Sequence, residues 1–277
     1  MPVPAPDHAH FSRPCHVDLE LVSVAYRARS FPIHSHAEYV IGTVDSGAEY
    51  LDVGGNSHLV EPGDIFHLNP EQPHANAAVG SEILRYRVFY IPVSTVSSLL
   101  EDDNAALGFS QVKRHDIDKA GTLSALHRQL ECGTGGKLEQ ETALFDLLGM
   151  VASDKGQPIE LWPMPHAVAQ ARSYIEAYFD EGFGLAQLAR IAGVSPYHLA
   201  HSFKRAIGMS PLAYRNQCRI REAARQVRSE QPLAEIAVAL GFADQSHLTR
   251  QFQRLIGLSP ARYRQQYRSS PLTDGKV

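Results

Sequence analysis

The stretch that decides the fold runs from Ser195 to Arg264 and reads SPYHLAHSFKRAIGMSPLAYRNQCRIREAARQVRSEQPLAEIAVALGFADQSHLTRQFQRLIGLSPARYR. It contains one pattern written twice, once a single extra residue is allowed in the second copy. The matching pairs are Leu199 and Leu248, Phe203 and Phe252, Arg205 and Arg254, Ile207 and Ile256, Gly208 and Gly257, Ser210 and Ser259, Pro211 and Pro260, Tyr214 and Tyr263, and Arg215 and Arg264. Such an internal repeat predicts two copies of one supersecondary unit.

Each copy is predicted to be a helix-turn-helix. Apolar residues at helical spacing form a first helix near residues 185–192 and 233–240, and each ends at a glycine, Gly193 or Gly241. The second helices begin after the N-cap residues Ser195 and Asp244. The repeated leucine, phenylalanine and isoleucine would face the core, so the opposite face of each second helix is free to meet DNA.

A rigid spacer is predicted between the two copies. Ser210-Pro211 provides an N-cap and a first-turn proline, and no glycine or proline interrupts the chain from Leu212 to about Arg228. A continuous helix of that length extends about 25 Å. It can hold two recognition helices roughly one DNA turn apart, near 34 Å, in successive major grooves.

This doublet resembles the DNA-binding domain of AraC/XylS-type transcription regulators. The resemblance is carried by Gly241-Phe242, by the segment 248–252 (LTRQF), and by the two Gly-x-Ser-Pro-x-x-Tyr-Arg endings at 208–215 and 257–264. It covers about the last hundred residues. The family implies a sequence-specific regulator that binds double-stranded DNA, acts as a homodimer and has RNA polymerase as a further partner, and it implies no enzymatic activity.

The candidate DNA contacts lie on the two second helices. Residues near the N-terminus of a recognition helix reach base edges, whereas later basic residues contact phosphates. The alanine methyl suits thymine, Gln245 suits adenine, and Arg250 suits guanine or a phosphate. The complete set is Ser195, Tyr197, Ala200, His201, Lys204 and Arg205 in the first copy, and Gln245, Ser246, His247, Thr249 and Arg250 in the second.

Charge divides the 277-residue chain in the same way. Residues before Pro165 include 11 Lys and Arg against 22 Asp and Glu, for a net charge of −11, whereas later residues include 15 against 8, for +7. The total of −4 therefore combines an acidic half with a basic half. The basic half is expected to attract DNA phosphates.

The chain is expected to act in the cytoplasm. Cys15, Cys132 and Cys218 are odd in number and lack metal-ligand spacing, which indicates a reducing compartment without disulfides. The N-terminal sequence shows no export signal. No apolar run approaches the roughly 20 residues of a membrane span, so no membrane partner is expected.

The domain organisation predicted from the sequence is α+β. Short β-rich runs separated by turns, from about Val17 to Pro92, indicate a small antiparallel barrel, with Gly54-Gly55-Asn56 as a hairpin tip. Leucine stripes then predict two helices separated by residues 133–136, one covering the barrel and one forming a dimer seam. The expected boundaries are an arm at 1–17, a sensor domain at 18–155, a linker at 156–165, an all-α DNA-binding domain at 166–268 and a tail at 269–277.

The β-rich half resembles the cupin barrel that serves AraC-type regulators as a sensor domain. The resemblance is carried by His34-Ser35-His36, Gly47, Pro62-Gly63-Asp64, Asn69-Pro70 and His74. It implies a small-molecule effector bound inside the barrel. Candidate ligand-binding residues are His34, His36, Tyr39, His74 and Arg85, and an arginine would favour an effector with a carboxylate.

The three histidines leave several interpretations open. His34 and His36 alternate onto one face of a predicted strand, and His74 occupies the place of a further cupin ligand, so together they suit a divalent metal such as Zn, Ni or Fe. Val40 stands where cupins have a glutamate, although Glu38 shares the alternation. The other interpretations are a polar effector pocket and ordinary structural histidines.

Two alternative functions follow from these residues. A metal-sensing regulator would keep the DNA-binding half and change only the signal. A cupin-type metalloenzyme with an appended DNA-binding domain would need the full ligand set, and the missing glutamate argues against it.

Overall fold

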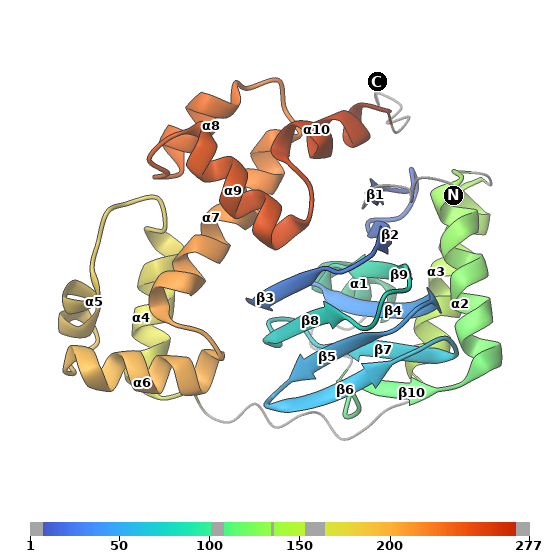
Figure 1. The fold of residues 1–277 in the computed structure, drawn as a ribbon, viewed down its shortest axis with the longest axis horizontal. Coiled ribbons are helices and arrows are strands. Elements are labelled where there is room, and N and C mark those ends of the chain that lie inside the picture. Colours follow the sequence, from blue (N-terminus) through green and yellow to red (C-terminus); the bar gives the residue numbers. More distant parts are fainter. Residues whose placement is uncertain (1–7, 101–107, 134–135, 153–163, 270–277) are drawn as a thin grey trace. The chain divides into compact units, whose positions relative to one another are not determined.

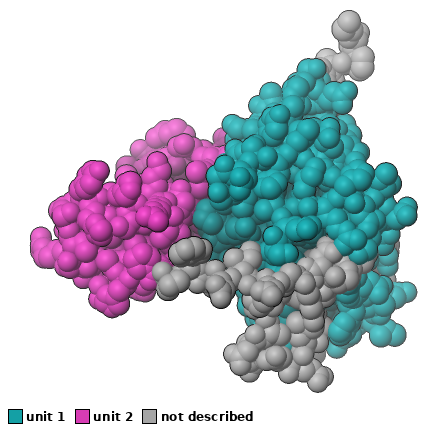
Figure 2. All heavy atoms as spheres, turned by 90° about the horizontal axis from the view of Figure 1, so that it is seen from below, with its two compact units in different colours: residues 1–30, 35–159, 266–277 teal, residues 31–34, 160–265 magenta. Residues whose placement is uncertain are grey.

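A computed structural model describes residues 8–100, 108–133, 136–152 and 164–269. The chain divides into two compact units, one of residues 1–30, 35–159 and 266–277 and the other of residues 31–34 and 160–265, which Figure 2 distinguishes by colour. No helix among the described residues is long and apolar enough to cross a membrane.

Two antiparallel sheets form the N-terminal domain (Figure 1). The first has the strand order β1-β2-β9-β4-β7-β10, formed by His8–Ser12, Glu20–Tyr26, Leu84–Ile91, Tyr39–Ser46, Asp64–Leu68 and Lys113–His115. The second has the order β3-β8-β5-β6, formed by Ser30–His34, His74–Ala78, Glu49–Val53 and Asn56–Val60. Since β3 lies beside β8 in this sheet, it is described with the N-terminal domain.

Strand β4 is buried on both faces and separates two apolar clusters. Val40 and Val44 pack with residues of the second sheet, such as Leu51, while Tyr39 and Ile41 pack with the helices that follow the strands. Successive side chains of a strand point to opposite faces, which explains this division. Between the two valines, a Cβ at Gly42 would lie 2.2 Å from Cζ of Phe66, so the close approach of this ring requires glycine.

Three helices follow the strands: α1 (Val93–Leu100), α2 (Ile117–Glu131) and α3 (Lys137–Ala152). Helix α2 packs on β4, β7 and β9, and α3 runs beside α2 (Figure 1). Asp116 caps α2, since its side chain accepts a hydrogen bond from the Lys119 N–H. Leucines of both helices are buried, while Leu138 and Phe145 of α3 are 75% and 53% exposed. Helix α2 therefore covers the first sheet, as the sequence predicted for one of the two helices.

Some strands of the N-terminal domain were not predicted. Strand β1 lies inside the expected arm and pairs with β2 from His8 to Ser12, while residues 1–7 are outside the described residues. Strand β8 (HANAA) lacks the β-branched residues that identify a strand, and β10 is a charged tripeptide. The predicted hairpin tip is confirmed, because Gly54 and Gly55 join β5 to β6, both with positive φ.

The C-terminal domain is entirely helical among its described residues. Its helices are α4 (His166–Ala177), α5 (Leu185–Ile191), α6 (Pro196–Ile207), α7 (Pro211–Val227), α8 (Leu233–Ala239), α9 (Gln245–Ile256) and α10 (Pro260–Ser269). Helices α5 and α6 form the first helix-turn-helix, and α8 and α9 form the second. The single spacer helix is confirmed as α7, and the two-domain α+β architecture is confirmed with it. The predicted linker lies largely outside the described residues.

Helix ends explain why the repeat folds in this way. The side chains of Ser195, Ser210 and Asp244 accept hydrogen bonds from backbone N–H groups at 3.2, 3.2 and 2.6 Å, and so cap α6, α7 and α9. Gly208 and Gly257 end α6 and α9 in the left-handed conformation, with φ of 80° and 92°. The repeated glycines and N-cap residues are thus structural.

Candidate functional site

Helix α6 presents a polar face opposite its buried stripe of Leu199, Phe203 and Ile207. On that face Tyr197 is 84% exposed, and its ring stacks on the ring of His201 with 6.4 Å between centroids. One turn further along, Lys204 and Arg205 are exposed, and Ala200 is half-buried. The exposed face therefore combines an aromatic pair near the helix N-terminus with two cations behind it.

Helix α9 presents a comparable face opposite Leu248 and Phe252. Gln245, Ser246 and Arg250 are exposed, so their polar groups can reach a partner. His247 and Thr249 are half-buried. The Thr249 hydroxyl donates to the Gln245 carbonyl at 2.8 Å, and His247 accepts a 3.4 Å hydrogen bond from the Ala243 N–H through Nδ1. These last two side chains thus contribute to the local structure of the helix N-terminus.

The paired Tyr-Arg endings hold each helix-turn-helix together. Tyr214 packs edge-on against Phe203 at 5.7 Å, and Tyr263 packs in the same way against Phe252 at 5.4 Å. Each following arginine binds the loop before the first helix of its own copy. The Arg215 guanidinium donates to the Phe183 carbonyl, and that of Arg264 donates to the carbonyls of Val227 and Gln231. The repeat thus encodes the scaffold rather than the DNA-facing surface.

One buried arginine connects the two copies, and sequence reasoning did not identify it. Arg219 lies in the middle of α7 and is 5% exposed. Its guanidinium donates to the carbonyls of Phe179 and Gly241, each at 2.6 Å, and to those of Asp180 and Glu181 at 3.3 and 3.1 Å. A Cβ at Gly241 would lie 2.2 Å from the Asp180 oxygen, so the turn of the second copy meets the end of α4 directly. We call these contacts the Arg219 clamp.

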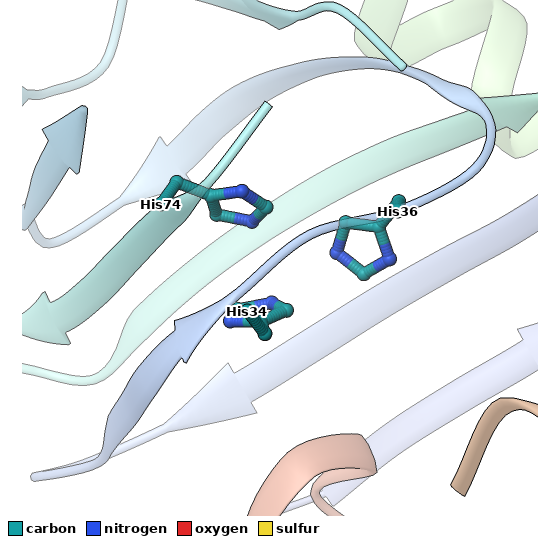
Figure 3. Close-up of side chains that lie close together, drawn as sticks. All are labelled: His34, His36 and His74. Atoms are coloured by element: carbon teal, nitrogen blue, oxygen red, sulfur yellow. The ribbon is translucent and has the colours of Figure 1, made fainter. Parts of the chain in front are cut away.

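The N-terminal domain brings together the three histidines predicted from the sequence (Figure 3). His34 ends β3, His36 lies in the connection that follows, and His74 begins β8. One ligand atom from each ring lies within 4.8 Å of the other two. The predicted alternation along one strand is wrong in detail, because β3 ends at His34 and His36 belongs to the connection.

Burial affects the protonation of this group. His34 and His74 are buried and His36 is half-buried. Desolvation lowers the pKa of His34 to about 4, even though a hydrogen bond to the Pro32 carbonyl opposes the shift. His34 is therefore a neutral imidazole at neutral pH.

Two other predicted ligand residues lie elsewhere. Tyr39 is buried in the cluster under α2, with its ring edge-on to Phe109 at 5.8 Å. Arg85 is exposed, and its neighbour on β9, Tyr86, packs against the cluster between the two sheets. Because adjacent residues of a strand face opposite ways, Arg85 points away from that cluster.

A buried carboxyl group lies between the sheets and was missed in the sequence. Glu49 is 1% exposed, and its carboxylate accepts a hydrogen bond from the Asn76 amide at 2.9 Å. Burial raises the pKa of Glu49 to about 7. The alternation of Glu49, Leu51 and Val53 contained the signal, because it places a carboxylate on the apolar face of β5.

A separate polar network fixes α2 to the first sheet. The Arg87 guanidinium donates to Asp45 and to Glu131, each at 2.9 Å, and the Ser124 hydroxyl donates to Asp45. Burial alone would raise the pKa of Glu131, but hydrogen bonds from His127 and Ser23 and the nearby Arg87 lower it to about 2. Arg87 is therefore a structural residue.

Two protein families match the chain. A family described as a helix-turn-helix domain matches residues 188–266, and one described as the AraC-like ligand binding domain matches residues 16–148. Together they span both halves of the architecture described above.

Several relatives are known by sequence. The uncharacterized HTH-type transcriptional regulator YbfI of Bacillus subtilis is 26% identical over 245 residues, which cover 85% of this chain and 89% of the relative. The arabinose operon regulatory protein of Salmonella typhimurium is 26% identical over 221 residues, covering 75% and 76%. The HTH-type transcriptional activator Btr of B. subtilis is 30% identical over 216 residues, but these span only 39% of that longer protein.

Solved structures show the same fold. Apo ToxT from Vibrio cholerae aligns with a TM-score of 0.60 at 14% identity, covering 92% of this chain and all of the ToxT chain. ToxT bound to an unsaturated fatty acid aligns with a TM-score of 0.56 at 13% identity, covering 91% and 96%.

Proposed function

This chain belongs to the AraC-type transcription regulators, with an N-terminal ligand-binding domain and a C-terminal DNA-binding domain, and from this premise we propose that α6 and α9 bind one operator at the same time. Each helix would enter one of two successive major grooves on the same side of the duplex. The effector bound in the N-terminal domain would then change the affinity of this two-helix contact.

The observation that carries the proposal is the Arg219 clamp together with the unbroken helix α7. Two recognition helices bind one DNA only if their separation and orientation match the groove spacing. A spacer of 17 residues extends about 25 Å, and the clamp ties the turn of the second copy to the end of α4. Binding through the second helix then costs little additional entropy once the first is bound.

We assign base contacts to the exposed residues at the N-terminal ends of the two helices. In α6 these are Tyr197, Ala200 and His201, with Lys204 and Arg205 on phosphates. In α9 they are Gln245, Ser246 and Arg250, with His247 and Thr249 at the edge of the contact. Ser195 would approach a phosphate through the N-terminus of α6, which it caps.

Selection of binding sites from random duplex DNA tests this function. The full-length protein is expected to enrich a site with two conserved segments whose centres lie about 10–10.5 base pairs apart. His201→Ala should relax the sequence preference in one segment and Arg250→Ala in the other. Arg225→Ala is a matched control, because Arg225 is an exposed cation of α7 that pairs with Glu222. Enrichment of a single segment, or of no sequence, would contradict the proposal.

We further propose a polar effector rather than a purely apolar one. ToxT has been solved with an unsaturated fatty acid bound, but the buried residues of this chain include Glu49, Asn76 and His74. Such groups pair with hydroxyl or amine groups of a ligand. A thermal-shift screen of sugars, polyols, amines and carboxylates tests this, with operator affinity measured for each hit. If only fatty acids or other apolar compounds stabilise the protein, the polar assignment is wrong.

The remaining partners follow from the same role. We propose a homodimer that contacts through the exposed face of α3, where Leu138 and Phe145 lie seven residues apart on one side of the helix. Phe145→Glu should yield monomers in sedimentation velocity, whereas the exposed Lys137→Glu should not. The protein would act on DNA in the cytoplasm and contact RNA polymerase from its operator.

A further inference from the structure

The three-histidine group has the organisation of a prepared metal site. His34 and His74 come from the neighbouring strands β3 and β8, and His36 lies two residues after His34, so a short connection and two paired strands position all three rings (Figure 3). The rings of His36 and His74 lie 5.2 Å apart between centroids. Among the described residues, the group offers three nitrogen ligands and no carboxylate.

Backbone hydrogen bonds select the nitrogen that each buried ring can offer to a ligand. Nδ1 of His34 lies 2.8 Å from the Pro32 carbonyl, and Nδ1 of His74 lies 3.0 Å from the Gln72 carbonyl. A carbonyl oxygen accepts only, so each Nδ1 carries the proton and donates it. Nε2 of each ring then bears the lone pair. Histidines that bind metals are usually oriented by a hydrogen bond of this kind from the other ring nitrogen.

The connections that carry His36 and His74 are also joined to each other. The Glu71 N–H donates to the His36 carbonyl at 2.6 Å, and the Ser35 hydroxyl donates to the Glu71 carboxylate at 3.1 Å. Glu71 has a φ of 60°, in the left-handed region that non-glycine residues rarely adopt. Such conformations persist where the surrounding structure imposes them, often at ligand sites. The loop 69–72 thus holds His36 and His74 in one arrangement.

We propose that His34, His36 and His74 bind one first-row transition-metal ion of the Zn²⁺ class, with a water or an exogenous ligand at the fourth position. Three imidazoles suit Zn²⁺, Ni²⁺ and Cu²⁺, whereas Mg²⁺ and Ca²⁺ require oxygen ligands that the group lacks. Nitrogen ligands about 2.0–2.1 Å from Zn²⁺ in a tetrahedron lie roughly 3.4 Å apart. The ligand atoms therefore have to approach each other by at most about 1.4 Å, which small side-chain rotations provide.

Metal binding is tested directly on the full-length protein without DNA. After removal of metal with a chelator, titration with Zn²⁺ and with Co²⁺ should show about one equivalent bound per chain, and Co²⁺ should give the visible absorption of a tetrahedral nitrogen site. His36→Asn and His74→Asn should each lower the affinity at least tenfold, in line with the loss of one of three ligands. Circular dichroism and thermal melting of the metal-free variants show whether they are folded.

Other histidines supply matched controls. His58→Ala on β6 and the double variant His8→Ala/His10→Ala on β1 should keep full metal binding, because these residues lie outside the group. The proposal is overturned if wild-type protein binds no stoichiometric Zn²⁺ or Co²⁺. It is equally overturned if folded His36→Asn and His74→Asn bind as wild type does, or if the double variant abolishes the binding.

A regulatory effect of the metal rests on the proposed function and is tested separately. Operator affinity is compared with saturating Zn²⁺ and with chelator, and a change of fivefold or more that disappears in His36→Asn would make the metal part of the signal. Loss of DNA binding in both conditions would count against the proposed DNA contact and leave the metal stoichiometry intact. Equal affinity in both conditions, with stoichiometric metal, would exclude a signalling role and retain the site.

Discussion

Replacement of Arg219 by methionine should separate the geometry of the DNA-binding domain from its base contacts. Methionine retains much of the apolar stem of the side chain but removes all guanidinium donors. The carbonyls of Phe179 and Gly241 then lose their 2.6 Å partners. At about 1–3 kcal/mol for each buried acceptor left without a partner, the domain should lose about 2–6 kcal/mol of unfolding free energy. A domain with 5–15 kcal/mol of stability stays folded at low temperature after a loss in the lower part of that range.

The effect on DNA should depend on the length of the site. With the two helix-turn-helix units less firmly joined, affinity for a full operator should fall about 10–100-fold, because the second contact loses its high effective concentration. Affinity for a duplex with a single segment should change by no more than about twofold. Fluorescence anisotropy at fixed salt measures both, and Arg225→Ala on the same helix is the control. If folded Arg219→Met binds the full operator as tightly as wild type does, the positioning role assigned to the clamp is wrong.

Three further perturbations test separate parts of the structure. Arg250→Ala should weaken specific binding by about 1–3 kcal/mol, and equal operator affinity in a competition assay would refute a base contact. Glu49→Gln concerns pH. Because burial raises the folded pKa of Glu49 from 4.5 to about 7, ionisation costs stability as pH rises through this window. The variant should thus melt like wild type at pH 4 but, by up to about 3 kcal/mol, more stably at pH 8; parallel melting curves at both values would contradict this. Gly42→Ala places a Cβ against the Phe66 ring and should destabilise the N-terminal domain by about 1–3 kcal/mol, and Phe66→Leu in the same chain should recover part of the loss, unless the ring is not the obstacle.

The C-terminal domain could be predicted almost completely because its signals are local. Ser195, Ser210 and Asp244 cap helices within three residues of themselves, and Gly208 and Gly257 end them. Repetition made each signal visible twice. Arg219 was not predicted because its partners lie 22 to 40 residues away, and nothing in the local sequence distinguishes it from the exposed arginines of the same helix.

The N-terminal domain was predicted less completely because its contacts are mostly distant in sequence. Strand β8 is a strand through its pairing with β5, not through the propensity of its residues. The three histidines were identified from their spacing and do come together. Arg85 and Tyr39 were selected as polar residues on predicted strands, yet the direction of each side chain depends on which face of the strand meets the second sheet. Glu49 was visible in the alternation of β5, but its burial follows only from the packing of both sheets.

The most direct test of the central claim is an interference footprint on the selected operator, in which modified guanines and phosphates that prevent binding are mapped base by base. Simultaneous binding of α6 and α9 predicts two interference segments, centred about 10–10.5 base pairs apart on one face of the duplex. His201→Ala should weaken one segment and Arg250→Ala the other. A single segment, or two segments on opposite faces of the duplex, would contradict the account.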